Sequence, residues 1–338
     1  MTAMTNDHET ETLVSVRAAI NQALDEALAS DPSVFLLGED IIDPAGGVFQ
    51  VTQGLSTKYG SDRVRDTPIS EQAIVGAAIG AAVGGMRPVA ELMFMDFLAI
   101  ALDQLVNHAA KLRYMSGGRV HVPMTIRTAV GAGFGVGAQH SQMLEAWLMH
   151  APGVKVVIPS NPADAKSLLR ACIEDDDPCV FVEQLALLER KGPLGGAVRL
   201  GQADITRSGS DVSVLTYGRQ VHDALDAAER LAAEGISVEV VDLRSLVPLD
   251  EATIFESVSR TRRAVVVHEA VMTCGAGAEI SSRIHEELFS DLDAPVQRVG
   301  AEAIPVPYAR PLEQEMLPGG DDIVAAVRRS FEYRRAVR

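Results

Sequence analysis

Short apolar runs alternate with amphipathic segments along most of this chain. Residues 16–24 place apolar side chains at helical spacing, and residues 34–37 form an apolar run of the length of a buried strand. The same pattern continues, with strands predicted at 87–92, 124–127, 154–158 and 178–182 and helices predicted at 70–85, 97–115, 142–149 and 162–173. Strands that alternate with helices favour a parallel sheet with helices on both faces.

A second series of this kind follows a stretch rich in glycine, proline and charge between Leu188 and Gly201. We therefore predict an α/β protein of two domains, each a mostly parallel sheet flanked by helices. The strands of the second series are predicted at 212–216, 238–241, 264–267 and 296–299. The predicted ranges are a disordered tail at 1–12, a first domain at 13–190, a linker at 191–203 and a second domain at 204–338.

Composition narrows the classes of function. A length of 338 residues suits two domains, and a net charge of −16 argues against binding to nucleic acid or to an anionic membrane. The three cysteines form no Cys-x-x-Cys pair, which predicts a reducing, cytoplasmic setting. The longest apolar run, 73–86, is too short to span a bilayer, so we expect no membrane segment.

The start of that apolar run carries the first candidate for chemistry. Thr67 is predicted as the N-cap and Pro68 as the first residue of a helix, which places Glu71 in the first turn. One interpretation is that Glu71 only complements the helix dipole. The other is that a carboxylate at the dry end of an apolar helix serves in proton transfer.

A glycine-rich loop at 131–137 carries the second candidate. Its spacing does not match a dinucleotide-binding G-x-G-x-x-G motif, so we predict flexible backbone beside a site. His140 follows the loop near a predicted helix start. It is either an acid–base or anion-binding group or a hydrogen-bonded capping residue, and the sequence favours neither.

Other clusters of polar residues can be interpreted either as functional or as purely structural. Glu39 follows a predicted strand, where parallel sheets place functional groups, but charged residues also simply end strands there. The acidic segment 174–178 is either a solvated turn or a site for a hard cation. His268 and Glu269 are predicted to be structural or interfacial rather than catalytic.

Together these segments resemble the β subunits of the thiamine-diphosphate-dependent, decarboxylating component of 2-oxo acid dehydrogenase complexes. The resemblance spans nearly the whole chain, and its motifs occur in the order of that family. They are Gly38-Glu39-Asp40, Asp66-Thr67-Pro68-Ile69-Ser70-Glu71, Arg87-Pro88-Val89-Ala90-Glu91, Arg113-Tyr114-Met115-Ser116-Gly117-Gly118, Gln139-His140-Ser141-Gln142, Pro152-Gly153-Val154-Lys155-Val156-Val157 and Val241-Asp242-Leu243-Arg244.

The resemblance implies a fold, a cofactor and roles for particular residues. The implied fold is a transketolase-type pyrimidine-binding domain followed by a transketolase C-terminal domain. Glu71 matches the acid that hydrogen-bonds the aminopyrimidine of thiamine diphosphate and so promotes loss of a proton from its thiazolium carbon. His140 matches the histidine that assists acyl transfer to a lipoyl group, and Glu39 matches an acid that links two cofactor sites. Met95 stands beside the pyrimidine, where many pyruvate-using members have an aromatic residue.

The resemblance also implies a metal site and partners. A structural potassium ion would be held chiefly by carbonyls at Met124, Cys172, Ile173, Asp175 and Asp177. The chain lacks the Gly-Asp-Gly…Asn pattern that holds magnesium and the diphosphate, so an α subunit in an α2β2 heterotetramer is expected to supply it. The acyl group would pass to a lipoyl acyltransferase core.

Substrate choice stays open at this level. Residues 91–94 and 126–133 look closest to acetoin dehydrogenase β subunits, whereas residues 46–49 and 268–270 look more like pyruvate dehydrogenase. One alternative is the C-terminal subunit of a split transketolase-like enzyme. Another is a non-catalytic partner subunit in which Glu71 only caps a helix.

Overall fold

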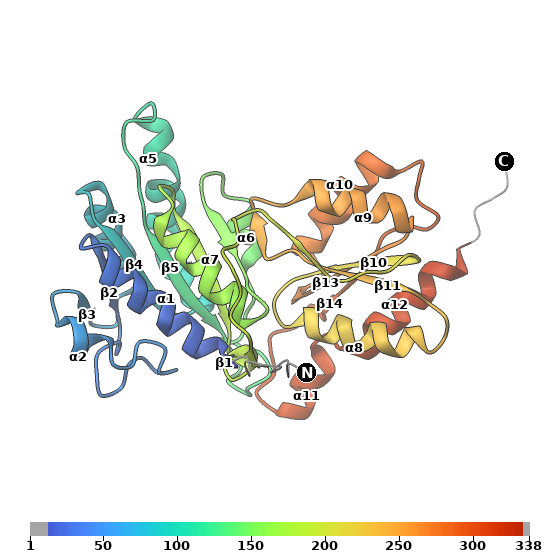
Figure 1. Ribbon diagram of the computed structural model, residues 1–338, viewed down its shortest axis with the longest axis horizontal. Coiled ribbons are helices and arrows are strands. Elements are labelled where there is room, and N and C mark those ends of the chain that lie inside the picture. Colours follow the sequence, from blue (N-terminus) through green and yellow to red (C-terminus); the bar gives the residue numbers. More distant parts are fainter. Residues whose placement is uncertain (1–12, 334–338) are drawn as a thin grey trace, which may run out of the picture.

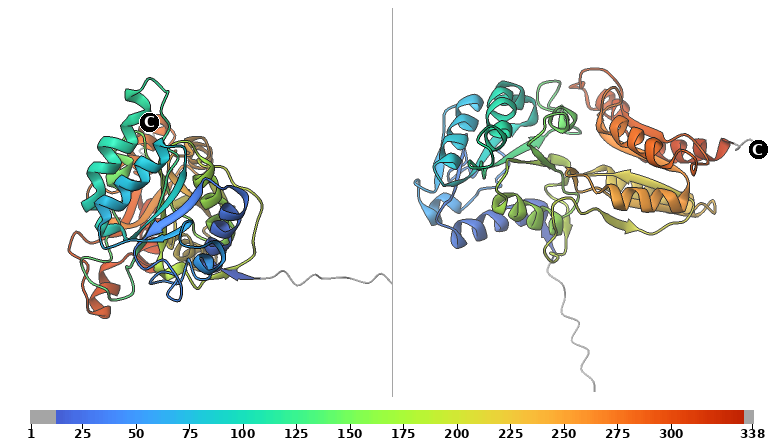
Figure 2. Two further views of the ribbon diagram at one scale, coloured as in Figure 1. Left: turned by 90° about the vertical axis from the view of Figure 1, so that its left-hand side faces the viewer. Right: turned by 90° about the horizontal axis from the view of Figure 1, so that it is seen from above.

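Residues 13–333, the part of the chain that the computed structural model describes, form two halves that lie side by side, each built on its own sheet (Figures 1 and 2). This confirms the predicted α/β class. The predicted tail at 1–12 lies outside the described residues.

The first half holds a sheet in the order β12-β6-β7-β5-β4-β2-β3. Neighbouring strands of this sheet are parallel, because helical crossovers connect them. The exception is β12, which is antiparallel to β6. The elements of this half are β1 (Val14–Ser15), α1 (Val16–Ser30), β2 (Val34–Gly38), α2 (Leu55–Tyr59), β3 (Val64–Asp66), α3 (Glu71–Val83), β4 (Arg87–Phe94), η1 (Met95–Phe97), α4 (Leu98–Asp103), η2 (Gln104–Ala109), α5 (Ala110–Met115), β5 (Thr125–Val130), α6 (Glu145–Met149), β6 (Lys155–Val157), α7 (Pro162–Glu174), β7 (Cys179–Gln184), η3 (Leu185–Leu187) and β8 (Lys191–Gly192).

The second half repeats the arrangement with a smaller sheet in the order β14-β13-β10-β11-β9, in which only β9 is antiparallel to its neighbour. Its elements are β9 (Asp204–Arg207), β10 (Val212–Thr216), α8 (Gln220–Ala232), β11 (Val238–Asp242), β12 (Ser245–Val247), α9 (Glu251–Thr261), β13 (Ala264–Val271), α10 (Ala276–Leu288), β14 (Gln297–Ala301), α11 (Arg310–Met316) and α12 (Gly320–Glu332).

Helices cover both faces of each sheet, as the alternation predicts. In the first half α1 packs with α7 on one face, and α3 packs with the segment α4–η2–α5 on the other. In the second half α8 and α12 cover one face and α9 and α10 the other (Figure 1). The strands between them are almost wholly buried aliphatic residues, which explains the continuous apolar runs.

The two halves share a core. One continuous cluster of buried apolar residues runs from α3 and β5 of the first half to β10, β13 and α10 of the second. Strand β12 leaves the second half and pairs with β6 at the edge of the first sheet. Polar contacts add to this junction, because the Ser160 hydroxyl donates to the Asp242 carboxylate and Arg244 pairs with Asp164 at 2.9 Å.

Two predicted helix starts and the regularity of one predicted helix are wrong. The N-cap of α3 is Ser70, not Thr67, because the Thr67 amide instead donates to the Gly38 carbonyl and continues the pairing of β2 with β3. The predicted helix 97–115 contains the π-helical segment η2, and the predicted helix 142–149 begins only at Glu145.

Candidate functional site

The side chains predicted for the site follow the carboxyl ends of four neighbouring parallel strands. Glu71 begins the helix after β3, Glu39 follows β2, Met95 follows β4, and His140 lies in the connection between β5 and α6. These strands are adjacent in the order β5-β4-β2-β3. The structure therefore brings all four residues to one edge of the sheet, which is where open parallel sheets bind ligands.

Two carboxyl groups at this edge have no protein partner. Glu71 is 9% exposed, and neither its side-chain carboxyl group nor that of Glu39 forms a hydrogen bond or ion pair with another described residue. Partial burial raises the pKa of Glu39, and the neighbouring carboxylates Asp40, Glu71 and Asp66 raise it further. These acids are therefore available to a ligand that carries nitrogen or hydroxyl groups.

Thr67 adds a third unpartnered polar group in the same connection. Its hydroxyl oxygen is buried and has no hydrogen-bond partner, although its amide donates to Gly38 at 2.9 Å. A buried polar atom without a partner is costly unless a ligand or water satisfies it. The connection from β3 to α3 thus has the character of a binding site rather than of a closed turn.

The His140 ring packs against aromatic side chains. Its centroid lies 4.9 Å from that of Phe94 and 5.4 Å from that of Phe97, with both pairs edge to face. Helix α6 begins at Glu145 and its N-cap is Leu144, so the interpretation of His140 as a capping residue is wrong. No other described residue forms a hydrogen bond with the ring, which leaves its nitrogens available.

Met95 lies in the core below this edge. Its side chain is fully buried, and its sulfur accepts a hydrogen bond from the Leu144 amide at 3.2 Å. This contact ties the end of β4 to the segment that follows His140. Contact between Met95 and a cofactor stays a prediction.

A buried ion triad supports the edge, and sequence reasoning missed it. Arg127 of β5 pairs with Glu91 of β4 and with Glu183 of β7, each at 2.7 Å. Burial raises the pKa of Glu183, and the charge of Arg127 opposes that effect. The available signal was charge inside apolar strands, because both Glu91 and Arg127 interrupt otherwise apolar runs.

A second set of buried polar side chains joins the two halves of the molecule. The Tyr217 hydroxyl donates to Glu145 at 2.8 Å, and the Gln184 amide donates to Glu269 at 3.1 Å. Burial raises the pKa of both Glu145 and Glu269 to about 7. The contact of Glu269 with the first half fits its predicted interfacial role.

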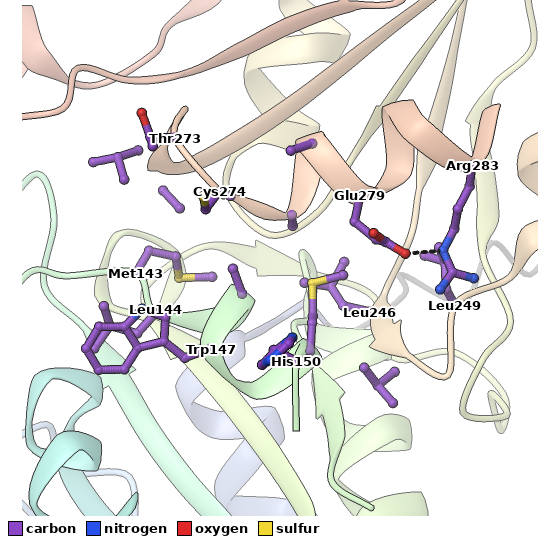
Figure 3. A pocket seen from close by; sticks show the side chains of 18 of the residues that line it. Met143, Leu144, Trp147, His150, Leu246, Leu249, Thr273, Cys274, Glu279 and Arg283 are labelled. Carbon is purple, nitrogen blue, oxygen red and sulfur yellow. Dashed lines mark hydrogen bonds and ion pairs between the residues drawn. The ribbon is translucent and has the colours of Figure 1, made fainter. Parts of the chain in front are cut away.

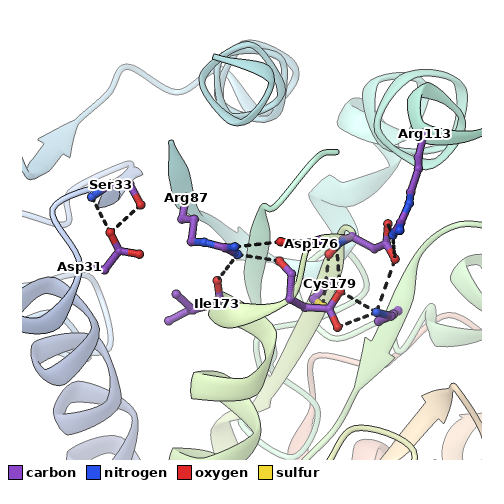
Figure 4. Close-up of polar contacts among 10 residues, drawn as sticks. Asp31, Ser33, Arg87, Arg113, Ile173, Asp176 and Cys179 are labelled. Atoms are coloured by element: carbon purple, nitrogen blue, oxygen red, sulfur yellow. Dashed lines mark hydrogen bonds and ion pairs between the residues drawn. The ribbon is translucent and has the colours of Figure 1, made fainter. Parts of the chain in front are cut away.

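The acidic turn after α7 leads directly into β7, so it lies at the opposite, amino-terminal edge of the sheet. Figure 4 shows the polar contacts around this turn. Arg87 donates to the carbonyls of Ile173 and Asp175 at 3.1 and 2.9 Å, and Lys155 pairs with the Asp175 carboxylate at 2.6 Å. Arg113 pairs with Asp177 at 2.7 Å. Basic side chains thus already neutralise this turn, and two of the carbonyls predicted to bind potassium accept hydrogen bonds from one of them.

The remaining predicted potassium ligands have partners as well. The Met124 carbonyl accepts the Cys179 amide at 3.0 Å, and the Cys172 carbonyl accepts the Asp175 amide at 3.4 Å. Within residues 13–333, no group of three or more His, Cys, Asp or Glu side chains is arranged to hold a metal ion. The potassium site, which depends on carbonyl oxygens, stays a prediction.

A separate cleft lies between the two halves of the molecule. It has a volume of about 1040 Å³ and is lined by Met143, Trp147, Leu246 and Cys274 among others, with Glu279 and Arg283 at one side (Figure 3). None of Glu71, Glu39 and His140 lines it.

In the described residues, no helix is both long and apolar enough to cross a membrane.

Comparison with known proteins agrees with this arrangement. The chain matches the transketolase pyrimidine-binding domain over residues 13–191 and the transketolase C-terminal domain over residues 201–323. Fold and site thus define a protein of the transketolase type. The chain belongs to the family of β subunits of the thiamine-diphosphate-dependent component of 2-oxo acid dehydrogenase complexes, of the pyruvate and acetoin dehydrogenase type, which confirms the resemblance seen in the sequence.

Two relatives illustrate the family. The chain is 49% identical over 331 residues to the acetoin:2,6-dichlorophenolindophenol oxidoreductase subunit beta of Cupriavidus necator, a match that covers 94% of this chain and 98% of that one. It is 46% identical over 324 residues to the pyruvate dehydrogenase E1 component subunit beta-2, mitochondrial, of Oryza sativa subsp. japonica, covering 94% and 86%. A solved structure, a split gene transketolase described as an inactive beta4 tetramer, matches with a TM-score of 0.79 at 24% identity over 95% of this chain and 99% of that one, and shows the fold alone.

Proposed function

We propose that this chain supplies the pyrimidine-binding half of a thiamine diphosphate site in a dehydrogenase that cleaves pyruvate, acetoin or a similar substrate. The observation that carries the proposal is the placement of Glu71 and Glu39, two carboxyl groups without protein partners, at the same edge of a parallel sheet as His140. The identity to acetoin and pyruvate dehydrogenase β subunits supports the same reaction class.

The residues present fit the polar edge of an aminopyrimidine. Glu71 is nearly buried and unpartnered, and the Thr67 hydroxyl beside it is buried without a partner. When bound, thiamine diphosphate supplies a nucleophilic carbon that attacks the carbonyl of the substrate. Glu71 would hold a proton on the ring nitrogen of the aminopyrimidine, and Met95 would pack beside the ring.

His140 and Glu39 would act on protons at the reacting end. The nitrogens of His140 are free while its ring is fixed by Phe94 and Phe97, so the histidine can orient the substrate and transfer a proton. Glu39, whose pKa is raised, would carry a proton between two cofactor sites of the assembly.

We also propose the partners of this chain. An α subunit in an α2β2 heterotetramer would hold magnesium and the diphosphate, and the acyl group would pass to a lipoyl domain of an acyltransferase core. Potassium would bind chiefly at carbonyls of Met124, Cys172, Ile173, Asp175 and Asp177. We place the complex in the cytoplasm, since all three cysteines are free thiols in the structure.

The test is co-purification of this chain with its α partner, followed by turnover assays with pyruvate, acetoin, branched 2-oxo acids and a ketol-donor sugar phosphate. We expect turnover with a 2-oxo acid or acetoin and reduction of a lipoyl acceptor. Ketol transfer between sugar phosphates would instead establish a split transketolase. A complex with no turnover on any of them would establish a non-catalytic partner subunit. Complexes that carry Glu71→Gln serve as the inactive control.

A further inference from the structure

The glycine loop that carries His140 is held at its tip by the other half of the molecule. The Gly133 and Gly135 amides donate to the two carboxylate oxygens of Glu313, at 2.8 and 2.9 Å. Glu313 lies on α11 in the second half and is 1% exposed. Each oxygen of this buried carboxylate thus accepts a hydrogen bond from one end of a short glycine segment.

The loop conformation is specific for this contact. Gly133 and Gly135 have φ angles of +92° and +68°, which side chains other than glycine rarely adopt. A Cβ on Gly135 would lie 3.3 Å from the Tyr308 carbonyl oxygen, so the loop rests directly on the segment that leads into α11. The loop thus directs two amides, two residues apart, toward one anion, which here is the Glu313 carboxylate.

The base of the loop lies against the backbone of His140. A Cβ on Gly131 would lie 2.3 Å from the His140 carbonyl oxygen, so the two ends of the loop are in close contact. On the far side of His140, the buried carboxylate of Asp96 accepts hydrogen bonds from the Gln142 amide at 3.3 Å and from its side chain at 2.9 Å. His140 therefore lies between two carboxylate anchors, one from each half.

We infer that Glu313 is a positioning residue for His140. Charge-assisted hydrogen bonds are about twice as strong as neutral ones, so the loss of this anchor should free the loop tip and, through the closed base, the imidazole ring. The expected effect on acyl transfer rests on the proposed function. The expected effect on the loop and on the His140 ring does not, and it can be measured on the full chain alone.

The first test compares Glu313→Gln with the matched control Glu315→Gln, which alters an exposed carboxylate on the same helix. The Gln side chain keeps one acceptor but directs its NH2 group at the second glycine amide. In the full chain we expect amide hydrogen exchange of residues 131–140 to become roughly 10- to 100-fold faster in Glu313→Gln only. The NMR signal of the His140 ring, assigned with His140→Ala, should also shift in Glu313→Gln only.

The second test uses the enzyme assembled with its α partner. Glu313→Gln should lower kcat for acyl transfer on the order of 10²-fold with little change in KM, and should alter the pH profile, while deuterium exchange at the thiazolium carbon stays at the wild-type rate. Glu313→Asp, which keeps both acceptors, should recover part of the loss. It also replaces Glu313→Gln if that variant does not fold.

Two results would overturn the inference. One is an unchanged loop exchange and His140 signal in Glu313→Gln. The other is a mobile loop combined with wild-type transfer in the assembled enzyme. If the wild-type assembly itself shows no turnover, the proposed function fails, and the His140 signal in the full chain still decides whether Glu313 positions the ring.

Discussion

Glu71 and His140 lie at the same sheet edge but in different surroundings. Glu71 is a nearly buried acid at the start of a helix, and His140 is a ring fixed by aromatic contacts at the end of a loop. The difference predicts different steps for the two side chains. We expect Glu71 to act on the cofactor before substrate binds and His140 to act afterwards.

We expect Glu71→Gln to slow deuterium exchange at the thiazolium carbon by about 10²–10⁴-fold, since this is the usual contribution of a positioned acid or base. His140→Ala should leave that exchange close to the wild-type rate and impair acyl transfer instead. Both are measured in the assembled enzyme by NMR of the cofactor after an acid quench. Exchange at the wild-type rate in Glu71→Gln would reduce Glu71 to a helix cap.

The location of a site residue could be predicted from the sequence where a predicted strand or helix determines it. Glu39 and His140 follow predicted strands of a parallel sheet, so topology alone directs them to one edge. Glu71 was predicted only from the signals of a helix start, because strand β3 before it was not among the predicted strands. Glu313 was not predictable, because its partner glycines are 178 and 180 residues away and nothing near it signals a contact. The assignment of Thr67 as N-cap failed because a tertiary contact with Gly38 took precedence over local capping preference.

At the level of elements, α3 combines a buried and an unpartnered face. Ile74, Val75 and Ala78 are buried against the sheet, whereas Ala73, Ala77 and Gly80 are exposed on the other side. Small side chains allow another helix to approach closely. The sequence predicted this helix from its start signals and the apolar run 73–86. It did not predict the π-helical segment η2, which carries no glycine or proline signal.

We expect Gly80→Leu to disrupt subunit assembly. A Cβ at Gly80 meets no atom within 4 Å, so the added side chain should not disturb the chain itself and its effect should fall on a partner. Sedimentation velocity of the co-expressed complex measures the outcome. The control is Gly196→Leu, at another exposed glycine with open space around it. If Gly80→Leu sediments like the wild type, the interface lies elsewhere.

At the scale of the whole molecule, buried acids at the junction make stability depend on pH. Burial raises the pKa of Asp242 to about 7, from 3.8, although Ser160 and the Arg244 amide donate to it. Between these values the folded chain binds a proton that the unfolded chain has lost. The free energy of unfolding therefore falls as pH rises through this window, by at most about 1.4 kcal/mol per pH unit for this group.

We expect Asp242→Asn to flatten this part of the profile. The amide cannot ionise but keeps an acceptor for the Arg244 amide and gains a donor for Ser160. The free energy of unfolding of the variant minus that of the wild type should therefore be larger at pH 8 than at pH 4. Urea unfolding across this range measures the difference. Parallel profiles for the two proteins would show that Asp242 does not titrate in the window.

We further expect the isolated chain to bind thiamine diphosphate weakly and to show no turnover. It has no recognisable motif for magnesium and the diphosphate, and its acids match only the pyrimidine end of the cofactor. Calorimetric titration with cofactor and magnesium, with and without the α subunit, measures this. Tight binding and decarboxylation by the isolated chain would contradict a site shared between subunits.

The strand β12 has a consequence for how such a chain can be divided. It pairs with β6 and so covers an edge of the first sheet, although it is made only after most of that sheet has been translated. A fragment that ends near residue 203 would leave the backbone groups of β6 open to other molecules. Such fragments should aggregate unless the missing half is co-expressed. During synthesis, the first half should stay incomplete until residues 245–247 have left the ribosome.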